Sequence, residues 1–281
     1  MNPKKNNLWN VMKYINSTYY YLDKFERTKD NKFVEDTDEL SIIGKEIFDN
    51  FDMRHSHAFF VDICGAPGMY SKILIEDKGA KGIGISLPPE KGGVEFLFNH
   101  EKYKIFYKDI LEKKYKIDTN DKYIDLGIAS CVSYIENTKN SHNLNMELIL
   151  TSMNMILENL KQDGDMMINM SMKNIYTCFN ILDLILKQFD NVKLWKSKNV
   201  WATKNTFYIF CYGFNKDKKI DLTPYIHLVS KHNETADFNT KYVGTSDNFN
   251  KINHMMNEIY MVRINAWLDK LNTEDSQRET H

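Results

Sequence analysis

The sequence predicts an α/β fold with a mostly parallel seven-stranded sheet, an antiparallel edge strand, and helical extensions at both ends. Two observations support this prediction. Short apolar runs alternate with segments of helical periodicity from about residue 57 to residue 189, the pattern of strands joined by helices in a parallel sheet. Two further apolar runs, ending near residue 214, are joined by a segment without a helix, so they indicate an antiparallel connection.

Each element follows from its local pattern. Helical spacing of apolar residues surrounds a polar break at residues 8–26 and 37–50, ahead of the first strand. The expected strands cover residues 57–64, 80–87, 103–110, 123–132, 165–172, 191–197 and 206–214. Helices are expected at 69–79, 143–164 and 175–189, and the first two stop at a glycine.

The alternation stops after residue 214. Residues 222–232 and 248–271 again have helical spacing, and the polar tail at 272–281 has the composition of a disordered segment. The expected organisation is a helical segment at 1–50, a core at 51–215 and a helical extension with a disordered tail at 216–281. With 281 residues, 42% of them hydrophobic, the chain can bury a substantial core.

Charge and cysteine usage limit the classes of function. The net charge is −1, so an RNA surface would have to be a local patch. The sequence shows no secretory signal and no membrane span, which predicts a cytoplasmic protein without membrane contact.

The four cysteines, Cys64, Cys131, Cys178 and Cys211, lie far apart in apolar surroundings. They are expected to be reduced core thiols, and no metal site is expected.

The sequence FFVDICGAPGMYSK, residues 59–72, is the strongest functional signal. Asp62 ends an expected strand, Gly-Ala-Pro-Gly at 65–68 makes a turn, and Tyr70 and Ser71 begin a helix. Ligands of open α/β sheets bind at the carboxyl ends of the strands, and small residues let the backbone approach them. A purely structural turn is the alternative, but the combination favours a cofactor site.

The run VDICGAPGMYS resembles the S-adenosylmethionine-binding motif of FtsJ-like RNA ribose 2′-O-methyltransferases, which include bacterial ribosomal RNA methyltransferases and the eukaryotic and viral cap-1 enzymes. The order of elements from about residue 40 to 214 is similar too, and the likeness is closest to the cap methyltransferases. It implies a Rossmann-like S-adenosylmethionine-dependent methyltransferase fold. S-adenosylmethionine is then the expected cofactor, S-adenosylhomocysteine its product, and RNA, in particular capped mRNA, the partner.

The resemblance also implies cofactor contacts. Asp62 and the turn backbone would face the methionine portion. Ser86 or Leu87 stands where the family usually places an acid for the ribose hydroxyls. Asp109 matches the acid that accepts from the adenine amino group, with a helix-capping aspartate as the alternative. The implied set is Asp62, Cys64, Gly65, Ala66, Pro67, Gly68, Tyr70, Ser71, Ser86, Leu87 and Asp109.

The catalytic positions of the family depart from its pattern in this sequence. Methyl transfer to a 2′-hydroxyl requires its alignment and the removal of its proton, for which the family uses a Lys-Asp-Lys-Glu tetrad. Lys45 matches the first lysine, but Ser130, Asn169 and Thr206 occupy the other three positions. An asparagine amide is not a base, and the two hydroxyls carry no charge to tune a lysine.

Two functions follow from this departure. One is a catalytically deficient homologue that binds S-adenosylmethionine or RNA and acts as a regulatory subunit in mRNA capping or RNA modification. The other is an active ribose methyltransferase in which Lys173, four residues past Asn169, acts as a displaced base. A solvated or RNA-facing lysine is the structural alternative for Lys173.

Two further segments suggest partners. In residues 192–205 lysines alternate with tryptophans, which suits phosphate contact and base stacking. Lys196, Lys198 and Trp201 are therefore candidates for RNA binding, with an ordinary edge strand and loop as the alternative. The helix at 248–271 carries apolar residues over more than one stripe. It either packs on its own domain or binds a protein partner, such as a capping enzyme.

Overall fold

The computed structural model of the chain describes residues 1–15, 36–52, 54, 58–112, 116–119, 123–131, 141–172, 175–230 and 240–278. Seven strands form one sheet in the order β3-β2-β1-β4-β5-β7-β6. They are β1 (Phe59–Ile63), β2 (Lys81–Ser86), β3 (Tyr103–Tyr107), β4 (Ile124–Ala129), β5 (Leu160–Ser171), β6 (Phe189–Trp195) and β7 (Thr206–Phe214). β7 is antiparallel to both of its neighbours, β5 and β6, and the other pairs are parallel. The predicted fold class is confirmed.

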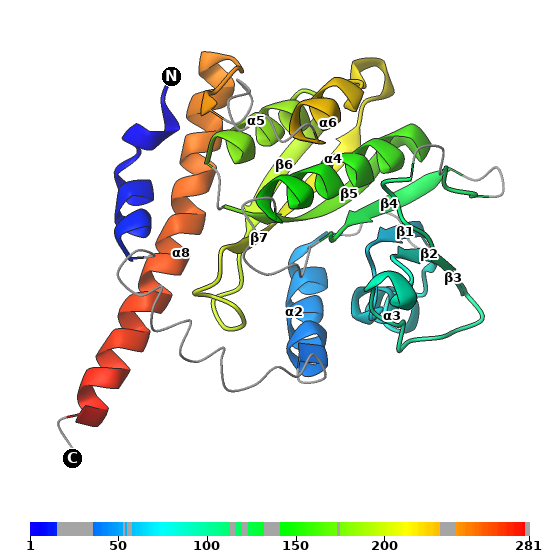
Figure 1. Cartoon of the computed structure of the whole chain (residues 1–281), viewed down its shortest axis with the longest axis horizontal. Helices are drawn as coiled ribbons and strands as arrows, with labels where there is room; N and C mark the ends of the chain where they lie inside the picture. The colour runs from blue at the N-terminus through cyan, green and yellow to red at the C-terminus, as the bar shows by residue number, and fades with distance from the viewer. Residues whose placement is uncertain are drawn as a thin grey trace.

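Helices cover both faces of the sheet (Figure 1). The helices α2 (Asp36–Asn50) and α3 (Met69–Glu76) bury their apolar residues in one core, together with residues of β1, β3, β4, β5 and β7. The helices α4 (Ser141–Asn159), α5 (Ile175–Leu186), α6 (Thr223–Ser230) and α8 (Ser246–Arg278) contribute to the other core. Three short 3₁₀ helices, η1 (Pro3–Lys5), η2 (Pro89–Lys91) and η3 (Lys216–Lys218), lie in connections or at the N-terminus.

Side chains pack closely in the part of the sheet formed by β3, β2 and β1. β1 is almost fully buried, as expected for a strand covered by helices on both faces. In β2, a Cβ atom at Gly84 would lie 1.9 Å from the Tyr103 hydroxyl of β3. Phe60 and Phe96 surround the same tyrosine ring. This aromatic cluster leaves no room for a side chain at position 84 of β2. It lies beside the turn that follows β1.

The two ends of the described chain pack together on the sheet. Residues 7–15 are helical and lie along α8 (Figure 1); Asn6 Nδ2 donates to Asn253 and Asn257, and the rings of Trp9 and Tyr260 are in contact. Residues 16–26 of the first predicted helix lie outside the described residues. The terminal segments thus share a core with the sheet, and the division at residues 50 and 215 stays a prediction.

The long C-terminal helix corrects one expectation and shows which of its apolar residues pack on the domain itself. α8 continues to Arg278, so the disordered tail predicted from residue 272 is wrong as far as 278. Residues 271–278 include Leu, Glu, Gln and Arg, which are good helix formers despite their polarity. Ile252, Met256 and Ile259 are buried, so the helix packs on its own domain. None of the described helices is long and apolar enough to cross a membrane.

Candidate functional site

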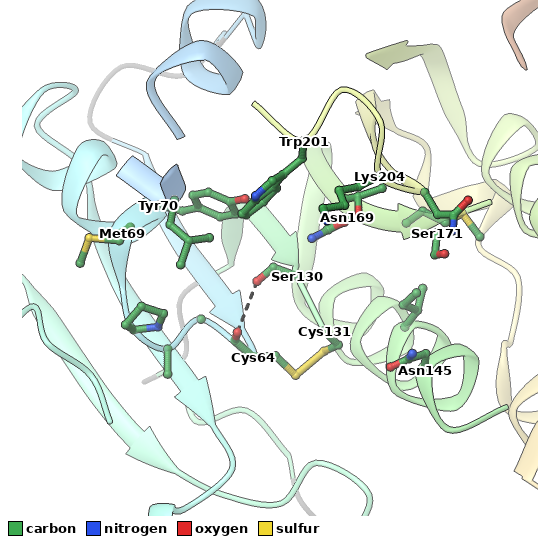
Figure 2. Close-up of a pocket in the computed structure, with 18 of the residues that line it drawn as sticks. Cys64, Met69, Tyr70, Ser130, Cys131, Asn145, Asn169, Ser171, Trp201 and Lys204 are labelled. Carbon is green, nitrogen blue, oxygen red and sulfur yellow. Dashed lines mark hydrogen bonds between the residues drawn. A yellow bond between two sulfur atoms is a disulfide. The ribbon is translucent and has the colours of Figure 1, made fainter. Parts of the chain in front are cut away.

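A cavity of about 600 Å³ opens where β1, β4 and β5 end and β7 begins (Figure 2). β1 and β4 are neighbours at the point where the strand order reverses, which is the usual ligand position in such sheets. The size is typical of small-molecule sites. Its lining comprises Glu39, Leu40, Cys64, Gly65, Ala66, Pro67, Met69, Tyr70, Ser130, Cys131, Asn145, Met146, Ile149, Asn169, Met170, Ser171, Trp201, Lys204, Asn205 and Thr206.

The turn after β1 forms one wall of the cavity. Its backbone is in the left-handed region at Cys64, with φ 61°, and at Gly68, with φ 98°, a conformation that favours glycine. A Cβ atom at Gly65 would lie 2.6 Å from the Asp62 carboxylate. The turn therefore folds directly over that carboxylate and presents residues 64–67 to the cavity; their contacts with a cofactor stay a prediction.

Asp62 supports this turn from beneath. Its side chain is fully buried and accepts hydrogen bonds from the Ser71 hydroxyl at 2.9 Å and the Ser130 hydroxyl at 3.2 Å. Burial raises the pKa of Asp62 to about 7, while the two hydroxyl donors act in the opposite direction. Asp62 joins the turn, α3 and the end of β4, but it is not part of the cavity lining.

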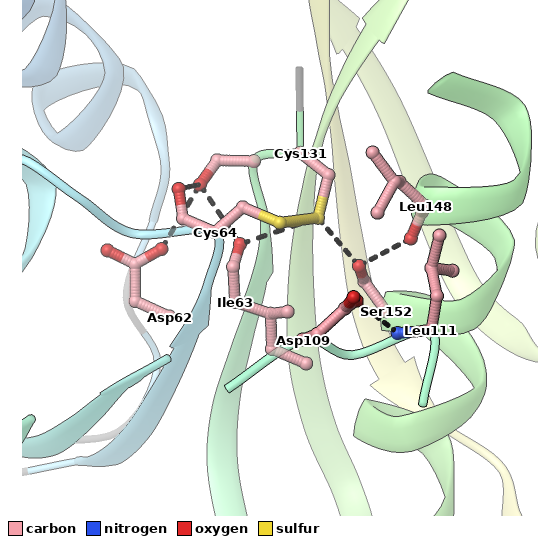
Figure 3. Close-up of a disulfide and its surroundings, with 9 residues drawn as sticks. Asp62, Ile63, Cys64, Asp109, Leu111, Cys131, Leu148 and Ser152 are labelled. Atoms are coloured by element: carbon pink, nitrogen blue, oxygen red, sulfur yellow. Dashed lines mark hydrogen bonds between the residues drawn. A yellow bond between two sulfur atoms is a disulfide. The ribbon is translucent and has the colours of Figure 1, made fainter. Parts of the chain in front are cut away.

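A disulfide between Cys64 and Cys131 crosses the cavity wall (Figure 3). The expectation of four reduced thiols is therefore wrong for this pair, whereas Cys178 and Cys211 are buried free thiols. The two partners are 67 residues apart in sequence, but the pairing of β1 with β4 makes Ile63 and Ala129 direct neighbours. The sequence spacing carried no signal for this pair, because the pairing depends on the order of the strands.

The structure brings together the three residues that the resemblance assigns to altered tetrad positions. Ser130, Asn169 and Thr206 all line the cavity. Lys45 lies on an exposed face of α2 and is not in the lining, and Lys173 lies outside the described residues. Among the lining residues, the charged side chains are those of Glu39 and Lys204. Figure 2 shows Lys204, Asn169 and Ser171 on the side of the cavity opposite Met69.

The rest of the expected cofactor set lies outside the cavity lining. Ser86 is buried, and one carboxylate oxygen of Asp109 accepts from the Leu111 amide at 3.0 Å, in a turn that begins at residue 110. The segment after β2 covers the far side of the turn, because the Leu97 amide donates to the Pro67 carbonyl at 2.9 Å. Roles for Ser86, Leu87 and Asp109 in cofactor binding remain predictions.

Lys196 does not lie on the surface, contrary to the sequence prediction. Its ammonium group donates to the carbonyls of Trp201, Lys204 and Thr206 at 3.0, 2.9 and 2.7 Å. Burial, and secondarily the nearby Arg263, lower the pKa of Lys196 to about 7. The sequence did contain a signal, because strand alternation places Lys196 on the same face as the buried Val192. A buried amine bound to three carbonyls is not available for RNA.

The other two RNA candidates are accessible. Lys198 is exposed. Trp201 lines the cavity and donates from its indole nitrogen to Glu39 at 2.6 Å, which ties the loop before β7 to α2. The lining residues Asn145, Ser171 and Asn205 were not singled out from the sequence. Asn145 lies one turn before Ile149 on the same face of α4, and only the placement of that helix brings it to the strand ends.

The core of the chain matches one known protein family. The model of the family described as FtsJ-like methyltransferase matches residues 45–214. No similar sequence was found among curated proteins. A solved putative ribosomal RNA methyltransferase from Plasmodium falciparum is 18% identical, with a TM-score of 0.48, over 62% of this chain and 96% of that one. A ribosomal RNA methylase from Streptococcus thermophilus is 13% identical, with a TM-score of 0.39, over 62% and 95%. With TM-scores below 0.5, these likenesses add no argument to the family match.

Proposed function

The chain belongs to the FtsJ-like methyltransferase family, and we propose that it binds S-adenosylmethionine and RNA but transfers methyl groups poorly or not at all when alone. S-adenosylmethionine is the cofactor of this family. When bound, it would supply the methyl group carried by its sulfonium sulfur, with S-adenosylhomocysteine as the leaving group. The residues present fit it. The turn at 64–67 lines the cavity with small side chains and backbone, and a glycine-containing turn of this kind allows close approach of a ligand.

The uncharged side chains at the three tetrad positions carry the proposal of weak catalysis. Ser130, Asn169 and Thr206 line it together, and the Ser130 hydroxyl already donates to Asp62. None of the three can hold a positive charge or remove a proton from a ribose hydroxyl at neutral pH. Loss of a general base typically costs about 10² to 10⁴ in rate, so alignment of the substrate is the main contribution left to these residues.

A second candidate function is favoured by one observation. Lys204 lines the same cavity as Asn169, so an active ribose methyltransferase could use this lysine as a displaced base. It stands beside the earlier candidate, Lys173. In this case Lys204→Met would abolish methyl transfer, whereas Lys251→Met, at an exposed position of α8, would retain it.

Cofactor binding is tested by calorimetry and thermal shift with S-adenosylhomocysteine. Ala66→Phe should weaken binding at least tenfold, because Ala66 lines the cavity and a phenyl ring would occupy it. Ile42→Phe is the matched control, since Ile42 is exposed on α2 and outside the lining. Equal affinity of the wild type and Ala66→Phe, or no binding at millimolar cofactor, would contradict the proposed site.

Catalysis is tested by transfer of labelled methyl groups to capped RNA, with an active family member as reference. The wild type should show little or no turnover. The triple variant Ser130→Asp, Asn169→Lys and Thr206→Glu should gain activity, because the tetrad residues act as a unit. Turnover of the wild type close to that of the reference would refute the proposal of a deficient site and favour the displaced lysine.

RNA binding is the third part of the proposal. The exposed Lys198 and the cavity residue Trp201 support it. Lys198→Glu and Trp201→Ala should each weaken binding of a short RNA, and the affinity of the wild type should fall with added salt. Lys251→Glu, on an exposed position of α8, controls for the change of charge. Unchanged binding in both variants would place the RNA elsewhere.

A supporting role beside a capping enzyme or another RNA-modifying enzyme completes the proposal. Met261 and Leu268 of α8 are exposed, at 42% and 50%, and offer an apolar surface for such a partner. The chain should then stimulate methyl transfer by the partner enzyme. The double variant Met261→Glu and Leu268→Glu should not stimulate it, and stimulation at the wild-type level would exclude this surface.

A further inference from the structure

The C-terminal helix contacts a loop of the cavity wall, although the helix lies outside the family-matched residues 45–214. Arg263 of α8 is 3% exposed. Its Nε donates to the Thr203 carbonyl at 2.7 Å, and its Nη1 donates to the Asn205 side-chain oxygen. Asn205 and its neighbour Lys204 line the cavity. A side chain from outside the core therefore holds part of the cavity wall.

Arg263 and Lys196 hold different groups of the same loop. Lys196 binds the carbonyls of Trp201, Lys204 and Thr206 from the end of β6. Arg263 binds the carbonyl of Thr203 and the side chain of Asn205. Because the two sets do not overlap, Lys196 cannot replace the contacts that Arg263 makes.

The arginine also fixes the orientation of the Asn205 amide. A guanidinium group only donates hydrogen bonds, so the atom of Asn205 that faces it must be the oxygen. The amide nitrogen is then directed away from Arg263 with two N–H donors, and within the described part of the chain it makes no hydrogen bond. Asn205 lines the cavity, and its donors are the groups that remain for a ligand.

We propose that Arg263 is a positioning residue that orients Asn205 as a hydrogen-bond donor to an oxygen of bound RNA, and that it thereby couples the docking of α8 to RNA binding. The inference rests on the proposed RNA binding in this cavity. The occupant is RNA rather than the cofactor because Asn205 precedes β7, on the same side as Asn169 and Lys204, whereas the cofactor turn forms the opposite wall.

Hydrogen exchange tests the positioning role without any ligand. In Arg263→Met, amides in residues 203–206 should exchange about tenfold faster or more, since charge-assisted hydrogen bonds are lost. Arg263→Lys should be intermediate, because a lysine can replace only part of the contact. Lys251→Met on the same helix is the control. No acceleration in the loop, or acceleration that is equal throughout α8 and α5, would overturn the positioning role.

RNA binding tests the donor role. Asn205→Leu should weaken binding of a short RNA about tenfold, whereas Asn199→Leu, on an exposed position of the same loop, should not. Arg263→Met should reproduce the loss, and S-adenosylhomocysteine affinity should be unchanged in all three variants. Wild-type RNA affinity in Asn205→Leu would overturn the donor role, and absence of RNA binding by the wild type would overturn it together with the proposed RNA function. Loss of cofactor affinity in Asn205→Leu would assign the donor to the cofactor and refute the inference.

Discussion

Replacing Asp62 with asparagine tests how the buried carboxylate beneath the cofactor turn affects folding. The side chain is fully buried, and burial raises its pKa from 3.8 to about 7 despite the hydrogen bonds from Ser71 and Ser130. The folded chain therefore holds a proton at Asp62 more tightly than the unfolded chain does. Asparagine keeps the shape and one oxygen acceptor, but it has no proton to lose.

The magnitude follows from the two pKa values, which differ by about 3. Each pKa unit corresponds to about 1.4 kcal/mol, so the full effect is about 4 kcal/mol. Because the folded pKa is raised, the contribution of Asp62 to stability is fully present below about pH 4 and is lost as the pH rises through 7. The wild type should therefore lose about 4 kcal/mol of unfolding free energy relative to Asp62→Asn between pH 4 and pH 8.

Urea denaturation of both proteins across this pH range measures the difference directly. The control is Asp125→Asn, which removes a carboxylate at the start of β4, away from the strand ends that form the cavity. Asp125 accepts a hydrogen bond from the Phe59 amide and pairs with Lys161. Subtracting the variant curve from the wild-type curve cancels the groups that titrate in both. Parallel curves for the wild type and Asp62→Asn would refute the reasoning, because the buried carboxylate would then have an ordinary pKa.

Three further predictions concern stability. Cys131→Ser should lower the unfolding free energy by about 4 kcal/mol relative to the oxidised wild type, as expected for a loop closed over 67 residues; equal stability would contradict the disulfide. Gly84→Ala should cost about 1–3 kcal/mol through overpacking against Tyr103, and adding Tyr103→Phe should recover part of it, whereas strict additivity of the two changes would argue against the contact. Because the folded pKa of Lys196 is lowered to about 7, wild-type stability relative to Lys196→Met should rise between pH 7 and pH 10, by at most about 4 kcal/mol; a pH-independent difference in denaturation experiments would contradict this.

The sheet and the cofactor turn could be predicted from the sequence because their signals are local. Strand-length apolar runs, turn glycines and helical spacing each act within about twenty residues. The error at the end of α4 shows the limit of such signals. The helical pattern extends to Gly164, but the helix ends at Asn159 and Leu160 already pairs with Ile124 of β4. Tertiary pairing overrode a continuing helical pattern.

Contacts between distant segments could not be predicted. The disulfide partner of Cys64, the place of Asn145 in the lining and the contact of Arg263 with Asn205 all depend on which elements become neighbours. A family resemblance can predict which elements are neighbours only within the matched residues 45–214. Arg263 lies outside it, so no motif could connect this arginine to the cavity.

If Ser130, Asn169 and Thr206 occupy the proposed tetrad positions, we expect the charges that would rebuild the tetrad to depend on one another. Asn169 is 8% exposed, between the buried Ile168 and Met170. A lysine alone at this position would be a buried cation without a carboxylate partner, because Ser130 and Thr206 are neutral, and an unpaired buried charge costs several kcal/mol. Asn169→Lys alone should therefore destabilise the protein. Adding Ser130→Asp and Thr206→Glu should recover much of that stability, which denaturation can measure independently of any methyl transfer. A single Asn169→Lys variant as stable as the triple variant would show that the lysine reaches solvent, and that the cavity is too open to enforce a shared tetrad.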